Sequence, residues 1–218
     1  MQQFALVNQM LEEVKGEDAL LELLIKRCAL KSVEPEYLDG IIFEFLFRST
    51  QKSIKQNLDI YFPNGLVNLQ SDLSNKYQPL QDLLIKHKYK EADMLTQSQL
   101  CKLVGLETKR GRNWLYFTDI AFLPSADLQI IDMLWRVYSR NKFGFSKQRE
   151  MWILTNHNWE KFWHKIGWKN DGIICRYPDD FLWNIDAPSG HLPLFNQLRG
   201  VQVLTALFNH IAWDKEKM

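Results

Sequence analysis

The chain has 218 residues, of which 46% are apolar and 24% charged, a composition typical of one large or two small globular domains. Its 27 basic side chains nearly balance 26 acidic ones, which argues against non-specific nucleic-acid binding. Cys28, Cys101 and Cys175 lie far apart and form no C-x-x-C pair, so the sequence predicts neither a disulfide framework nor a zinc site. We therefore expect the protein to work in a reducing compartment.

Residues 1–61 are predicted to form a small amino-terminal bundle of amphipathic helices. Apolar residues recur at helical spacing over 4–14, 20–28 and 38–45, and Pro35 suits the first turn of the third helix. No internal period supports a true helical repeat. For this unit the sequence favours a stabilising or protein-interaction role over a ligand site.

A linker is expected over residues 62–76, where turn formers and polar residues replace core-forming ones. The composition changes across it. Residues 1–76 hold 8 basic and 11 acidic side chains, residues 77–218 hold 19 and 15, and all eight tryptophans lie after residue 113. Two units are therefore predicted, 1–61 and 77–218.

The second unit is predicted to continue as helices. They are expected over 80–87 (opened by Pro79), 92–104, 125–135, 149–154, 159–166 (capped by Asn158) and 194–208. Only residues 114–117 and 173–174 are candidates for strands. The predicted fold class is therefore all-α, a small bundle plus a larger helical core.

Motifs for catalysis or metal binding are not found in the sequence. The five histidines form no H-E-x-x-H pattern, and there is no G-x-S-x-G, Walker loop or G-x-G-x-x-G. Asp179 and Asp180 are adjacent carboxylates, which are more typical of a turn than of an acid–base pair. We therefore assign no catalytic residue and no metal ligand.

The loop-rich segment 165–190 is the candidate ligand site. It holds five large apolar side chains that must either pack into the core or face a flat apolar ligand: Ile173, Ile174, Tyr177, Phe181 and Trp183. Packing into the core stays the alternative for each of them. A basic run over 136–149 is expected either to face an anionic partner or to be a solvated helix end.

Several motifs in the second unit occur together and in a fixed order. They are WLYFTDI at 114–120, PSADLQIIDMLW at 124–135, FGFSKQ at 143–148, IGWK at 166–169, APSGHLP at 187–193 and NQLRG at 196–200. This series resembles the genomes-uncoupled-four family, the tetrapyrrole-binding regulators of magnesium chelatase in oxygenic phototrophs. The resemblance covers about residues 77–218, and the helices ahead of it resemble the amino-terminal bundle of full-length members.

The resemblance implies an all-helical core shaped like a cupped hand, whose apolar palm binds protoporphyrin IX or Mg-protoporphyrin IX without a covalent bond. It also implies a protein that is not an enzyme and that stimulates magnesium insertion together with the large porphyrin-binding subunit of magnesium chelatase, in chlorophyll biosynthesis. A peripheral membrane association stays open. With no recognisable targeting segment, we expect the plastid stroma, as a plastid-made protein, or a cyanobacterium-like cytoplasm.

The resemblance also implies the residues of a porphyrin site. Arg199 matches a family arginine at the pocket and is expected to pair with a propionate, and Arg176 is a secondary cation at the rim. Tyr177 and Ile174 stand where relatives carry tryptophans, and Gln202 stands where a second arginine occurs. These three departures predict an altered affinity or an altered preference between the metal-free and magnesium porphyrins.

Two other interpretations stay open. The first is a pure interaction module that docks partners through residues 1–61 and the basic run 136–149. The second is a haem protein with His191 or His164 as the axial ligand.

Overall fold

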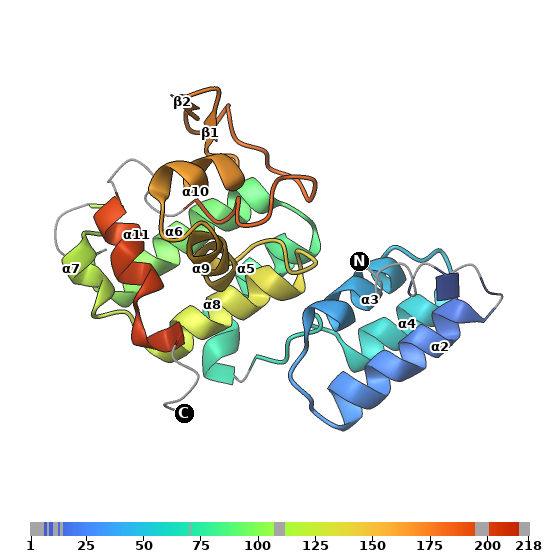
Figure 1. Cartoon of the computed structure of the whole chain (residues 1–218). Helices are drawn as coiled ribbons and strands as arrows, with labels where there is room; N and C mark the ends of the chain where they lie inside the picture. Colours follow the sequence, from blue (N-terminus) through green and yellow to red (C-terminus); the bar gives the residue numbers. More distant parts are fainter. Residues whose placement is uncertain are drawn as a thin grey trace.

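The computed structural model describes residues 7, 9–10, 13, 15–69, 71–106, 112–194 and 201–213. These residues are mainly helical, and the predicted all-α class is confirmed (Figure 1). The helices are α2 Gly16–Leu24, which runs on as a π-helix Ile25–Leu30, then α3 Tyr37–Phe47, α4 Lys52–Tyr61, α5 Ser71–Ile85, α6 Tyr89–Leu103, α7 Phe117–Ile120, α8 Ser125–Val137, α9 Phe145–Leu154, α10 Trp159–Lys165, α11 Val201–Phe208 and a 3₁₀ turn, Ile211–Trp213.

The only strands in the described residues are β1 Lys169–Asn170 and β2 Ile173–Ile174, which pair antiparallel. The strand expected at 173–174 is therefore confirmed, and the strand considered at 114–117 is wrong. Phe117 instead begins α7, whose first turn is closed by a 2.7 Å hydrogen bond from the Tyr116 N–H to Asp119 Oδ2. Among the described helices, none is both long and apolar enough to cross a membrane.

Helix α5 begins at Ser71, nine residues before the predicted range 80–87, so Pro79 lies inside the helix rather than at its first turn. The polar residues ahead of Pro79 make tertiary contacts that local propensity does not reveal. Tyr77 is fully buried and its hydroxyl bonds the Asp127 carboxylate, while Gln78 Nε2 donates to Asn64 O at 2.6 Å. These contacts outweigh the weak helix propensity of the segment.

The amino-terminal helices α2, α3 and α4 pack together as a bundle, drawn in blue to cyan in Figure 1. The Arg27 guanidinium on the π-helix grips the buried Asp39 carboxylate through two hydrogen bonds of 2.9 and 3.1 Å. Asp39 also accepts the Glu36 N–H at 2.9 Å, which caps the start of α3. The division into units 1–61 and 77–218 stays a prediction.

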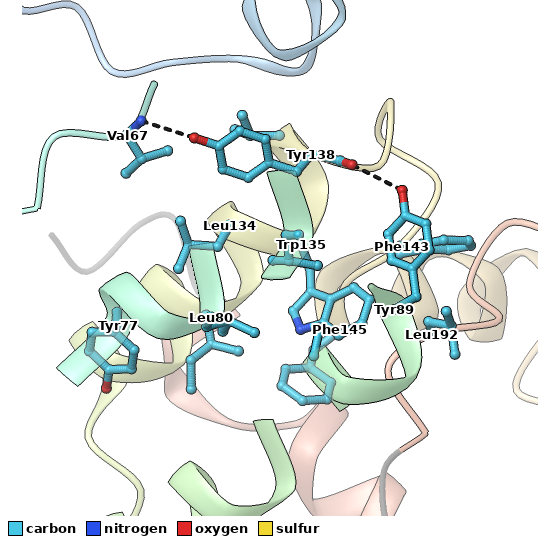
Figure 2. Packing of buried hydrophobic residues seen from close by; sticks show 14 of the residues in the cluster. Val67, Tyr77, Leu80, Tyr89, Leu134, Trp135, Tyr138, Phe143, Phe145 and Leu192 are labelled. Carbon is cyan, nitrogen blue, oxygen red and sulfur yellow. Dashed lines mark hydrogen bonds between the residues drawn. The ribbon is translucent and has the colours of Figure 1, made fainter. Parts of the chain in front are cut away.

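The core around α8 is built from aromatic rings (Figure 2). Trp135 is fully buried, stacks on Tyr89 at 6.2 Å and meets the edge of Phe143 at 6.3 Å. Its indole N–H donates to Thr96 Oγ1 at 3.0 Å, so the one polar atom of the ring is satisfied.

We call the contact between α3 and the end of α8 the junction. Gly40 permits it, because a Cβ there would lie 2.0 Å from Val137 O. Glu44 receives two hydrogen bonds from the Arg140 guanidinium, at 2.8 and 2.7 Å. The Tyr138 hydroxyl accepts the N–H of Leu66 at 2.8 Å, which holds the connection between α4 and α5 against α8.

Candidate functional site

The loop-rich segment that the sequence singles out follows α10 and is anchored by Trp168. This side chain is buried and stacks on Trp163 with centroids 5.5 Å apart and planes inclined by 13°. Its indole N–H donates to His191 O at 2.8 Å. Residues 168 and 191, far apart in the loop, are therefore tied together at its base.

A small hairpin projects from the core above α10, apart from the bundle (Figure 1). Asp171 and Gly172 form its turn, both with positive φ (47° and 82°), the conformation that a two-residue hairpin turn requires. The strands carry Ile173 and Ile174, which are 69% and 58% exposed. Two branched apolar side chains thus face solvent at adjacent positions.

Tyr177 lies just beyond the hairpin and is 46% exposed. Its ring meets Trp183 edge-on, at 6.0 Å and 90°, and the Trp183 indole N–H donates to Pro178 O at 3.0 Å. The pKa of Tyr177 is raised by burial and, to a smaller extent, by the nearby Asp93 carboxyl. The phenol ring is therefore in contact with the turn, while about half of the side chain remains accessible.

His191 is buried beneath this turn, and both of its ring nitrogens are engaged. Nδ1 lies 2.7 Å from Ile166 O, and Nε2 accepts the Leu182 N–H at 3.1 Å. Burial lowers the pKa of His191, and the hydrogen bond with the Ile166 carbonyl offsets this only in part, which favours the neutral ring. Because Nδ1 faces a carbonyl oxygen and Nε2 faces an N–H, the neutral ring carries its proton on Nδ1. The ring offers no nitrogen to a haem iron in this arrangement, and the other candidate axial ligand, His164, is exposed on α10.

Asp93 anchors the chain at Leu194, just beyond the loop-rich segment. It projects from α6, is almost completely buried and accepts the Leu194 N–H at 2.5 Å. Burial raises the pKa of Asp93 to about 8. Asp93 was not predicted as a site residue, although its spacing from Tyr89, Thr96 and Leu100 places a carboxyl on the buried face of the helix.

The residues that the resemblance implies fall into three groups. Ile174, Arg176 and Tyr177 lie together on one exposed stretch, whose turn is braced by a 2.8 Å bond from the Arg176 N–H to Asp180 Oδ2. Gln202 is exposed on α11, which packs on α7. Arg199 lies outside the described residues.

A cavity of about 500 Å³ is lined by Phe43, Phe47, Leu58, Phe62 and Ile85 among others. It is therefore formed by α3, α4 and α5 and not by the residues around Tyr177. Within the described parts of the chain, no group of three or more histidine, cysteine, aspartate or glutamate side chains could hold a metal ion.

Comparison with known proteins places most of the chain in one family. Residues 70–211 match the model of a family described as GUN4-like. A ycf53 protein of Porphyra purpurea is 47% identical over 211 residues, which cover 94% of this chain and 88% of the relative.

Two further relatives carry descriptive names. A protein of Arabidopsis thaliana named "Tetrapyrrole-binding protein, chloroplastic" is 33% identical over 146 residues, covering 63% of this chain and 55% of the relative. The structure of GUN4 from Chlamydomonas reinhardtii superposes with a TM-score of 0.59 at 38% identity, covering 67% of this chain and 95% of that one.

Proposed function

Because the chain belongs to the GUN4-like family, we propose that it binds a porphyrin, protoporphyrin IX or Mg-protoporphyrin IX, and catalyses no reaction on it. The relative whose name records tetrapyrrole binding supports the ligand class. The observation that carries the proposal is the exposed apolar stretch of Ile173, Ile174 and Tyr177 beside Arg176. A group of large apolar side chains that is exposed to solvent, on a loop held in place by buried hydrogen bonds, is typical of a binding surface.

The chemistry of a porphyrin suits these residues. The ring is a flat apolar disc with two propionates on one edge, so its site needs apolar walls and one or two cations at the rim. Burying several hundred Å² of ring contributes on the order of 10 kcal/mol before the costs of association. Binding is then tight but reversible. The four ring nitrogens hold the magnesium, so no dedicated metal ligand is required from the protein.

Each proposed contact has its own role. Tyr177 and Ile174 form a wall against the ring, and Gln202 offers a polar contact from α11. Arg199 pairs with a propionate, and Arg176 is a second rim cation. Because Arg176 is exposed, water screens its charge and its contribution is smaller.

The wider role that we propose is activation of magnesium chelatase, together with that enzyme's large porphyrin-binding subunit, in chlorophyll biosynthesis. The proposed location is the plastid stroma, for which the chloroplastic relative argues, or a cyanobacterium-like cytoplasm. We propose that residues 77–218 form the binding core and residues 1–61 a separate bundle joined by the segment 62–76. The start of the family match at residue 70 supports this division.

Titration of the purified protein with deuteroporphyrin IX, followed by tryptophan emission, tests the proposal. We expect saturable quenching at micromolar ligand, and no saturation would reject porphyrin binding. Arg199→Ala and Tyr177→Ala should each weaken binding by about 1–3 kcal/mol, the loss of a charged hydrogen bond or of a ring contact. Tyr61→Ala is the matched control, because Tyr61 is nearly as exposed as Tyr177 but lies on α4. Unchanged affinity in both site variants would remove the residue assignment.

A protein-interaction module without a small molecule is the second candidate. It is favoured by Leu30 and Ile60, which are each 70% exposed on the bundle. The same titration separates the two functions, because only the first predicts saturable quenching.

A further inference from the structure

The ring of His191 joins three separate parts of the loop-rich segment. Its Nδ1 donates to Ile166 O at 2.7 Å, directly after α10. Its Nε2 accepts the Leu182 N–H at 3.1 Å, and its own carbonyl accepts the indole N–H of Trp168 at 2.8 Å. Each ring nitrogen therefore has one partner, and each partner is a backbone group that a substitution elsewhere cannot change.

A short chain of contacts leads from this ring to Tyr177. The Phe181 ring packs on His191 with centroids 5.6 Å apart. Leu182, held by His191, is followed by Trp183, whose ring meets Tyr177 edge-on and whose indole N–H holds Pro178 O. The position of the turn 177–183 therefore depends on the bond at Nε2.

We propose that His191 is a positioning residue that holds the turn 177–183 closed only while its imidazole is neutral, and that protonation at Nε2 releases Leu182 and weakens porphyrin binding. The inference rests on the proposed function, because it assigns a consequence to the placement of Tyr177. Protonation turns Nε2 from an acceptor into a donor. Two N–H groups then face each other, and the Leu182 N–H loses its partner.

The ionisable groups around His191 are engaged elsewhere and do not pair with its ring. Asp180 accepts the Arg176 N–H at 2.8 Å, and Asp93 accepts the Leu194 N–H at 2.5 Å. The Cys175 thiol lies 3.5 Å from Gly167 O. Helix α9 presents a neutral side chain, since Gln148 Nε2 donates to Gly190 O and Pro193 O. From α10, His164 and Lys165 are exposed.

The direction of the pH effect follows from the two states. In the closed state burial lowers the pKa of His191, whereas in the open state the ring meets water and its pKa is about 6.5. Above pH 7 both states are neutral, so pH does not change their balance. Below about 6.5 the open state takes up a proton that the closed state refuses, and each further pH unit favours opening by up to about tenfold.

The experiment compares the wild-type protein, His191→Gln and His164→Gln at pH 7.5 and 5.5. Glutamine keeps an acceptor oxygen that does not titrate in this range, and His164→Gln removes a histidine that is exposed on α10. Two readouts are used: the protection factor of the Leu182 amide in hydrogen exchange and the affinity for deuteroporphyrin IX. For the wild type and His164→Gln, we expect the protection factor to fall by up to about tenfold at pH 5.5. The affinity should fall by a smaller factor, which is set by the fraction of molecules that remain closed. For His191→Gln, the protection of the Leu182 amide should not change with pH, and the only remaining change in affinity should come from protonation of the ligand's propionates.

The inference is overturned if the Leu182 amide of the wild type is equally protected at both pH values, or if His191→Gln loses as much affinity as the wild type. If His191→Gln does not fold, an NMR titration of the wild-type ring decides, and a midpoint at or above pH 6.5 overturns the inference. If the wild type binds no porphyrin at pH 7.5, the proposed function falls. The exchange measurement then judges the role of His191 by itself.

Discussion

The junction and the loop-rich segment after α10 use similar apolar side chains in opposite ways. At the junction, Phe43 meets Phe62 and Tyr138 edge-on, each at 6.2 Å, and all three rings are buried. In the loop, Ile174 and Tyr177 remain about half exposed. The aromatic rings of the junction pack against one another, whereas the loop presents its apolar side chains to solvent.

The polar contacts of the two regions differ in the same sense. The junction is closed by a pair of side chains, Glu44 and Arg140, which join the bundle to the core. The loop is held by bonds from side chains to backbone, made by His191 and Trp168. Backbone bonds fix the path of the loop and leave its apolar side chains free to contact a ligand. The junction therefore holds the bundle against the core, whereas the loop leaves apolar side chains in solvent, where we propose that the porphyrin binds.

Gly40→Ala should produce the largest loss of stability, because it adds a side chain at the close contact between α3 and α8. In a helix interior this change would ordinarily stabilise by about 0.5–1 kcal/mol. Here the new Cβ would lie 2.0 Å from the backbone oxygen of Val137, so we expect a loss of about 3 kcal/mol or more in the free energy of unfolding. Urea unfolding measures it. Gly172→Ala is the control: nothing lies within 4 Å of its Cβ, and its positive φ costs about 1 kcal/mol. Equal losses in both variants would contradict the close contact.

Asp93→Asn should have an intermediate effect that depends on pH. The pKa of Asp93 is raised by burial to about 8, so folding binds a proton that the unfolded chain releases near pH 4. The stabilisation is complete below the unfolded pKa and is lost as pH rises through the folded pKa. Between pH 6 and 7.5, the wild type should lose about 2 kcal/mol relative to Asp93→Asn, whose side-chain oxygen still accepts the Leu194 N–H.

Urea unfolding at several pH values measures this difference. Asp59→Asn provides the control, because Asp59 is an exposed carboxylate on α4 and its substitution should leave the pH dependence of the wild type unchanged. If Asp93→Asn kept the slope of the wild type, the buried carboxyl would be ionised in the folded state at neutral pH.

Helical periodicity was sufficient to predict the fold class and most of the elements. The apolar spacing around Leu38, Ile41 and Ile42 corresponds to α3, and Asn158 does cap α10 by accepting the Lys161 N–H at 2.9 Å. The start of α5 could not be predicted, because its polar first turns are stabilised by partners far away in sequence, such as Asp127. Periodicity reports the burial of apolar residues and not the pairing of polar ones.

The residues of the candidate site were predictable only in part. The strand at 173–174 and the cluster of large apolar residues were predicted from the sequence, whereas the hairpin turn at Asp171-Gly172 and the exposure of Ile173 and Ile174 were not. The sequence showed His191 only as a lone histidine, because its partners are backbone atoms of residues 166 and 182. Backbone groups carry no signal of residue type, so a scaffold built on them is found only once the chain path is known.

Ile174→Ser should have the smallest effect on stability and so tests the open region most sharply. The side chain is 58% exposed, so we expect the free energy of unfolding to change by no more than about 0.5 kcal/mol. The affinity of the Ile174→Ser protein for deuteroporphyrin IX should nevertheless fall by about three- to tenfold, because part of the apolar wall against the porphyrin ring is lost. Ile60→Ser is the matched control, because Ile60 is at least as exposed but lies on α4 in the bundle. If both substitutions changed the affinity equally, the loss of any exposed apolar side chain would explain the effect, and the assignment of the ligand to the loop would be contradicted. A fall confined to Ile174→Ser would mean that this exposed side chain faces the ligand.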